Sequence, residues 1–587
     1  MSTDPLPAAS SSSRFSWGTA IALIVAATLI MGAGWGIRGA FGHSRGAMMP
    51  GAMLGATLAV CAMRPDWWRR AAIICFACSI GWGFGGQSSY GLIIGYSNGG
   101  TLLNSMWGYG SLWLVGGLYG GIGAAILALV LTRPRSFLEQ FVWPLVLMYI
   151  GWLAVRHLVE LEPYFEWLLG NGEATADAWW HHLDFLRQSI LYYEGGEEAQ
   201  GSIYWLHDTL WLCVAVTVVL NSLLWAAVPK WRNANALIVL LAVGWFAGMF
   251  ILIKLAGVRM NPHRAETWAG VLGVQVALLG YFLYHRNWAG FMLSCYGFIA
   301  GAYGFSMADF VQTLGNAKWG PIGEYAWLRE FGYWTVMEQL FGCFMGFGAA
   351  VALIRFNRKG LAPPADDTPS RGIDVLSLLF VFGILMIVNF AKAYYGWLKI
   401  ENMKTVLLTF PIQNWAVPAA IVYLCVLLFV LLRLRRGKLA MVPASPFGRA
   451  QLQAFLITIL VLNMYLLLAR PTWTNLLTFV LAITIGLLII FTREEKPVEI
   501  TTATTPPESF SWFPGPVHWL LWILSPALIW GMATISIGFE LQRYQIRFPE
   551  EIEEPAETEE QETRLKLREP KGSPDNHEVL SGLRSNT

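Results

Sequence analysis

The feature that most constrains this chain is its succession of long apolar runs, separated by short polar segments. A run of about 20 apolar residues forms a helix long enough to cross a hydrocarbon core about 30 Å thick. Only 13% of the residues are charged, whereas soluble proteins carry about 25%. We therefore expect an all-α, polytopic integral membrane protein whose solvent is the lipid bilayer.

Hydropathy predicts about 14–15 transmembrane helices. Their expected positions are 17–36, 46–63, 71–86, 106–131, 141–158, 205–228, 235–257, 268–284, 288–309, 333–354, 375–395, 415–434, 452–469, 474–491 and 517–538. The first run is too long for a typical signal peptide and lacks a small-residue cleavage site, so we expect it to be retained as a helix.

Basic clusters recur in the predicted loops, at 64–70, 133–135, 230–232, 285–286, 355–359 and 433–438. If residues 1–15 are cytoplasmic, the predicted spans place all of these clusters on the cytoplasmic side, as the positive-inside rule requires. This pattern predicts a multi-pass protein of a cell membrane, such as the bacterial inner membrane. The segment 160–203 is then an extracytoplasmic loop.

Two parts of the chain share a pattern of small residues. The motif GxxxGxGAA occurs at 117–125 and again at 342–350, and Arg38-x4-His43 has a looser counterpart in Arg259-x3-His263. The block 86–95 similarly corresponds to 306–315. The order of these blocks predicts a parallel internal repeat of about four helices. Glycines four residues apart also let helices pack closely, and this simpler explanation stays open.

The repeat and the Pro-rich and charged segments suggest a division of the chain. The expected parts are a cytoplasmic segment 1–15, membrane repeat 16–136, a two-helix connector 137–232, membrane repeat 233–359, a linker 360–374, a C-terminal membrane bundle 375–540 and a disordered acidic tail 541–587.

Six basic residues fall at the predicted extracytoplasmic ends of helices, against the positive-inside bias. They are Arg38, His43, Arg45, Arg259, His263 and Arg264. Paired guanidinium groups bind carboxylate, sulfate or phosphate through two hydrogen bonds each, so these residues predict a site for an anion. The alternative is that each arginine reaches lipid headgroups or caps a helix end.

Four polar residues lie within or beside predicted spans: Gln87, Asp309, Gln312 and Glu338. Burying a charged side chain in a bilayer costs at least about 2.5 kcal/mol, so these residues should face the bundle interior or water. Glycine-dense sequence at 32–39 and 81–87 favours irregular backbone, which survives at membrane depth only inside protein or beside a wet cavity. A structural ion pair is the alternative role for Glu338.

No pattern indicates a metal or a cofactor, and we expect none. Cys75 and Cys78 form a CxxC pair inside an apolar run, where thiols behave as small hydrophobic groups. His181 and His182 are adjacent and so cannot easily share one tetrahedral ion. The net charge of +2 does not indicate nucleic acid as a partner.

These observations predict a membrane transporter or channel for a small polar, anionic solute, bound between the two repeats near the extracytoplasmic face. One alternative is a membrane-embedded transferase that acts on a lipid-linked or phosphorylated donor at the outer face. A second alternative is a structural subunit of a membrane complex.

Overall fold

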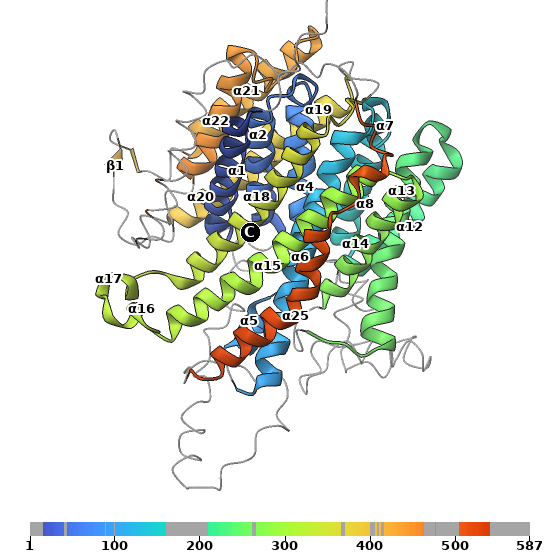
Figure 1. Ribbon diagram of the computed structural model, residues 1–587. Helices are drawn as coiled ribbons and strands as arrows, with labels where there is room; N and C mark the ends of the chain where they lie inside the picture. Colours follow the sequence, from blue (N-terminus) through green and yellow to red (C-terminus); the bar gives the residue numbers. More distant parts are fainter. Residues whose placement is uncertain are drawn as a thin grey trace, which may run out of the picture. The chain divides into compact units, whose positions relative to one another are not determined.

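The computed structural model describes residues 16–39, 44–88, 90–98, 100–159, 209–260, 266–364, 370–398, 406–407, 410–411, 416–462, 473, 476, 480 and 504–539. Within these residues the chain is almost entirely helical, and nine helices are long and apolar enough to cross a membrane (Figure 1). The prediction of an all-α, multi-pass membrane protein is confirmed at this level. The predicted loop 160–203, the span 474–491 and the tail 541–587 lie almost entirely outside the described residues.

Helices occupy the predicted span positions throughout the described ranges. Those of the first half are α1 (Trp17–Arg38), α2 (Ser44–Cys61), α3 (Pro65–Trp68), α4 (Ala71–Gly85), α5 (Gly91–Ser97), α6 (Leu102–Thr132), α7 (Arg135–Glu139), α8 (Val142–Val159), α12 (Thr209–Ala227), η2 (Pro229–Trp231), α13 (Arg232–Gly248) and η3 (Met249–Leu255). Those of the second half are α14 (Thr267–Tyr284), α15 (Trp288–Asn316), α16 (Pro321–Glu324), α17 (Ala326–Arg329), α18 (Tyr333–Arg358), α19 (Ile373–Leu378), η4 (Leu379–Ile384), α20 (Leu385–Leu398), α21 (Ala416–Arg435), α22 (Pro446–Leu462), η6 (Phe510–Trp512) and α25 (Pro516–Ser536). Two short strands, β1 (Val406–Leu407) and β2 (Phe410–Pro411), pair antiparallel.

Several of the basic clusters meet at one end of the helices. Arg70 donates hydrogen bonds to the carbonyl oxygens of Val130 and Arg133, at 2.6 and 2.7 Å. Arg135 forms a buried ion pair with Asp374 at 3.1 Å. These arginines therefore hold the loops after α3, α6 and the 360–374 segment together, in agreement with their predicted location on one side.

The direction of α1 shows which helix ends lie away from the basic clusters. Arg358, at the end of α18, lies over the ring of Trp17 at 3.9 Å from its centroid, so α1 begins at the basic end. Its 22 residues end at Arg38. Arg38 thus lies at the end of the bundle away from the basic clusters, where the sequence pattern had placed it.

Glycines set the closest helix crossing. In α6 and α15, added Cβ atoms at Gly120 and Gly297 would each overlap the other residue's carbonyl oxygen, and Gly116 and Gly301 face each other in the same way. Only residues without side chains let two backbones approach so closely. The 31 residues of α6 and the 29 residues of α15 are therefore packed directly against each other near their middles.

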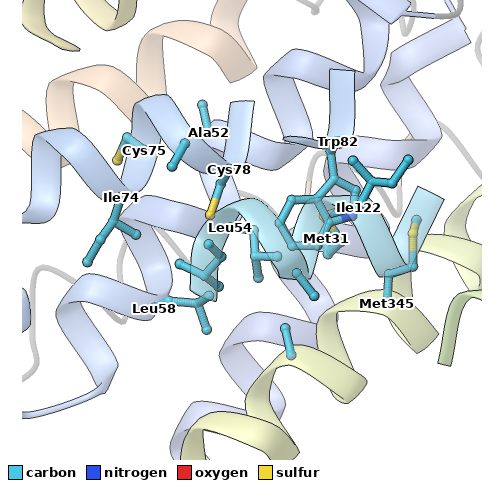
Figure 2. Close-up of a cluster of buried hydrophobic side chains, with 14 of the residues drawn as sticks. Met31, Ala52, Leu54, Leu58, Ile74, Cys75, Cys78, Trp82, Ile122 and Met345 are labelled. Atoms are coloured by element: carbon cyan, nitrogen blue, oxygen red, sulfur yellow. The ribbon is translucent and has the colours of Figure 1, made fainter. Parts of the chain in front are cut away.

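The core beside this crossing is apolar and is built from α1, α2, α4, α6 and α18 (Figure 2). Trp82 of α4 fills the space over Gly123 of α6, where any Cβ would overlap the indole ring. Cys75 and Cys78 are fully buried in this core and are free thiols. They pack as hydrophobic side chains, as their position in an apolar run predicted.

Candidate functional site

The α4 and α5 helices form one discontinuous helix beside α6. A Cβ at Gly85 would contact Tyr119, near the middle of α6, whereas Ser97 at the end of α5 lies against Gly108, nearer its start. The two helices therefore run one after the other, antiparallel to α6, and the non-helical residues 86–88 and 90 form a break between them. The glycine-dense sequence at 81–87 had favoured irregular backbone at this place.

Two side-chain hydroxyl groups lie against the carbonyl groups of residues 86–88 at this break. The Tyr119 hydroxyl lies 3.3 Å from the carbonyl oxygen of Gly86 and 3.1 Å from that of Ser88, and can donate its one hydrogen to either of them. The hydroxyl of Thr267, at the start of α14, donates to the carbonyl oxygen of Gln87 at 2.8 Å. Since buried backbone carbonyls need donors, Tyr119 and Thr267 stabilise the unwound backbone.

Three polar side chains converge on the break; with Trp35 and Tyr119 we call them the Arg38 cluster. Arg38 donates a hydrogen bond from Nη2 to the hydroxyl oxygen of Tyr90. The same hydroxyl donates to Oε1 of Glu338 on α18, at 3.3 Å. Arg38 and Glu338 are 1% and 4% exposed, and their opposite charges interact across Tyr90.

Aromatic rings surround the guanidinium of Arg38. Its central carbon lies 5.2 Å from the ring centroids of Trp35 and Tyr90, and 5.8 Å from that of Tyr119. The negative faces of such rings stabilise a cation at these distances. They also exclude water, so the electrostatic interactions inside the cluster are screened less than at a surface.

Hydrogen-bond donors exceed acceptors in the Arg38 cluster. Within the described part of the chain, Nε and Nη1 of Arg38 are buried and have no hydrogen-bond partner. The indole nitrogen of Trp35 and the hydroxyl of Ser88 share this property. Unpaired buried donors are costly. A ligand that brings hydrogen-bond acceptors would therefore stabilise this arrangement.

A second polar group, the Asp309 cluster, lies at the far end of α5. Asp309 on α15 is fully buried, and its Oδ2 lies 2.5 Å from the hydroxyl oxygen of Ser97. The hydroxyl of Thr313 donates to Oδ1 of Asn98 at 2.9 Å and receives a hydrogen bond from Tyr109 at 3.2 Å. Gln312 is buried on the same helix one turn after Asp309.

The structure thus places the predicted residues in two groups. Arg38 and Glu338 meet in the Arg38 cluster, and Gln87 lies in the break, where its backbone carbonyl accepts a hydrogen bond from Thr267. Asp309 and Gln312 belong to the Asp309 cluster, which α5 connects to the first group. Phe305 of α15 packs against Tyr90 with ring centroids 4.9 Å apart.

The second predicted arginine group is described only in part. Arg259 is partly buried, in the loop that precedes α14. In that loop, Glu266 accepts hydrogen bonds from the backbone nitrogen of Met260 at 2.9 Å and from the indole of Trp268 at 2.5 Å. Glu266 therefore shapes the loop. His43, His263, Arg264 and the side chain of Arg45 lie outside the described residues.

Three residues of the Arg38 cluster, Trp35, Tyr90 and Tyr119, were not predicted from the sequence. Tyr90 and Tyr119 carry the hydrogen bonds that connect Arg38, Glu338 and the break, but in an apolar run a tyrosine is more often a packing residue. For Tyr90 a signal was available, since it follows Gln87, Ser88 and Ser89 in a glycine-dense block. For Tyr119 the sequence holds no comparable sign.

An apolar cavity of about 360 Å³ lies beside the Arg38 cluster, between α1 and α18. Gly32 and Ala33 line one wall, and Gln339, the neighbour of Glu338, lines the other. Its mainly hydrocarbon lining fits an acyl chain better than a polar solute.

Comparisons with protein-family models, with curated proteins and with solved structures find no match for this chain.

Proposed function

We propose that this protein is a membrane carrier for a small anionic solute, which binds in the Arg38 cluster. The unpartnered Nε and Nη1 groups of the buried Arg38 carry this proposal. These two groups lie on different edges of the guanidinium, so each can donate a charge-assisted hydrogen bond to an oxygen of a carboxylate, sulfate or phosphate group. Trp35, whose ring centroid lies 5.2 Å from the guanidinium carbon, also has an unpaired indole N–H.

The hydrogen bonding of the backbone carbonyl groups at the break favours an anionic ligand over a cationic one. In many carriers, unwound carbonyl groups coordinate a bound cation. Here the carbonyl oxygen of Gln87 accepts a hydrogen bond from Thr267, and the Tyr119 hydroxyl can donate to the carbonyl oxygen of Gly86 or of Ser88. Donors are available and two of these three carbonyl acceptors can be occupied, so an oxyanion suits the hydrogen bonding of this cluster.

The burial of Arg38 favours a carrier over an open channel. With 1% of its surface exposed, Arg38 can receive a solute only after neighbouring helices move. The break between α4 and α5 gives these two helices freedom to move separately. Under the proposed orientation, with the basic clusters in the cytoplasm of a bacterial cell, the site opens towards the outside.

We propose that the two predicted repeats supply this motion. In partial agreement with a repeat, α1 packs on α2 as α13 packs on α14, and α4 packs on α6 as α15 packs on α18, whereas the extensive packing of α2 on α4 is only weakly matched between α14 and α15. Gly123 lies against α4 and its counterpart Gly348 lies against α15, the preceding helix of its own copy. Gly117 and Gly342 have unrelated partners, so the copies differ in how they contact each other.

One observation favours a second candidate, the membrane-embedded transferase for a lipid-linked phosphate. The apolar cavity between α1 and α18 could hold an acyl chain while the phosphate reaches the Arg38 cluster, because Gln339 in its wall adjoins Glu338. This function predicts a ligand with a long hydrocarbon chain.

A thermal-unfolding series of the purified protein in lipid nanodiscs tests both candidates. The ligands are inorganic phosphate, sulfate, acetate, succinate and dodecyl phosphate, each at increasing concentration. A ligand at 100 times its Kd stabilises by about 2.7 kcal/mol, which raises Tm. The carrier proposal expects a small anion to raise Tm. A rise with dodecyl phosphate alone would favour the transferase, and no rise with any ligand would contradict the anion site.

A further inference from the structure

The Asp309 cluster differs from the Arg38 cluster in the kind of polar group that has no hydrogen-bond partner. Within the described residues, Oδ1 of Asp309 and Oε1 of Gln312 are buried oxygens without a hydrogen-bond partner. They lie three residues apart on α15, so they are on the same side of this helix. Unpaired acceptors, rather than donors, therefore characterise this cluster.

The hydroxyl of Ser97 shows where a proton is needed. Its oxygen lies 2.7 Å from the carbonyl oxygen of Ile94 and 2.5 Å from Oδ2 of Asp309. A hydroxyl has one hydrogen and can make only one strong donation, so a second proton must fill the other contact. The Ile94 carbonyl has no proton to give. A protonated Asp309 that donates to Ser97, while Ser97 donates to Ile94, satisfies both contacts.

The charges around Asp309 favour the same arrangement. Among the described residues, no lysine, arginine or histidine forms an ion pair with Asp309. The titratable groups on the elements packed nearby are Tyr109 of α6, Tyr90 before α5, and Tyr333 and Glu338 of α18. None of these supplies a positive charge. An ionised carboxylate buried without a cation is strongly disfavoured, and a proton removes the charge.

We propose that Asp309 is a proton-binding site of this protein, occupied in the arrangement described here and emptied when α5 moves. When the Asp309 O–H bond breaks, the proton passes to water and a carboxylate remains. Ser97 must then turn its own hydrogen towards Asp309, which leaves the carbonyl of Ile94 without its donor. The last turn of α5 is thereby weakened.

The position of α5 connects this proton to the Arg38 cluster. Ser97 is the last residue of α5, and Tyr90, the residue before its first turn, binds Arg38 and Glu338. A seven-residue helix moves as one unit, so a shift at Ser97 reaches Tyr90. If the proposed carrier function holds, on which this step alone rests, movement of the anion is coupled to a proton.

Infrared spectroscopy of the full chain in nanodiscs tests the proton directly. Protonated carboxyl groups give a carbonyl stretching band separate from that of carboxylates. We expect Asp309→Asn to remove the intensity of one carboxyl group from this band at pH 7. The amide group that this substitution introduces can donate to Ser97 as the protonated acid does, so the variant should fold. Ser97→Ala should keep the band and shift it, because the acid loses its acceptor.

Glu324→Gln is the matched control, since it removes one carboxyl group that is exposed on α16, outside the Asp309 cluster. It should leave the band unchanged. An unchanged band in Asp309→Asn overturns the proposal. So does a wild-type band that is present without sodium and disappears when sodium is added, because a cation then occupies the cluster. These spectra need no transported solute, so their outcome is independent of whether the protein is a carrier.

Discussion

Arg38→Gln is expected to weaken binding of the stabilising anion by about 100-fold, since hydrogen bonds to charged groups contribute about 1.5–3 kcal/mol each. Glutamine keeps a polar side chain but loses the positive charge and the N–H groups of the guanidinium. Arg38→Lys restores the charge without the planar fork, and we expect it to recover part of the affinity. The midpoint of the ligand-dependent rise in Tm measures each affinity.

Two further variants separate this effect from damage to the fold. Arg329→Gln removes the same charge from α17, where the side chain is exposed, and should bind the anion as the wild type does. Arg38→Gln leaves Glu338 without its opposite charge, so Arg38→Gln combined with Glu338→Gln should fold better and still bind weakly. Full affinity in the double variant would exclude Arg38 from the site.

Gly120→Ala is expected to destabilise the protein by about 3 kcal/mol, at the upper end of overpacking effects. The added methyl group would overlap the carbonyl oxygen of Gly297, and backbone of a packed helix cannot move aside as a side chain can. Gly110→Ala is the control on the same helix, because nothing lies within 4 Å of a Cβ there. It should stabilise slightly, by about 0.5–1 kcal/mol.

Thermal or denaturant unfolding of both variants in the same lipid measures the difference. If Gly120→Ala and Gly110→Ala had equal stability, the direct crossing of α6 and α15 would be wrong. That result would also remove the framework that holds α5 between these two helices.

The helices could be predicted from sequence because the bilayer imposes one dominant rule. A span must be long, apolar and helical, so the positions of α1, α6 and α18 follow from hydropathy alone. The break after α4 was also foreseeable, since glycine-dense sequence is poor helix. Helix partners were not: the GxxxG pattern indicates close packing, but nothing in it says that Gly120 meets Gly297.

The charged residues of the candidate site could be predicted from the sequence. The hydrogen bonds that connect them could not. Arg38, Glu338 and Asp309 stand out because charged groups are costly in a bilayer. Their grouping depends on the path of α5, which places Tyr90 beside Arg38 and Ser97 beside Asp309. A tyrosine or serine inside an apolar run carries no such penalty, so its hydrogen bonds appear only when the helices are placed.

The most direct test of the proposed carrier is uptake of a radiolabelled anion by proteoliposomes containing the purified chain. The anion is the member of the thermal series that stabilises the protein most. We expect uptake by the wild type and by Arg329→Gln, and uptake at the level of protein-free liposomes with Arg38→Gln. Equal uptake by Arg38→Gln and the wild type, or no uptake by the wild type of an anion that binds, would contradict the account.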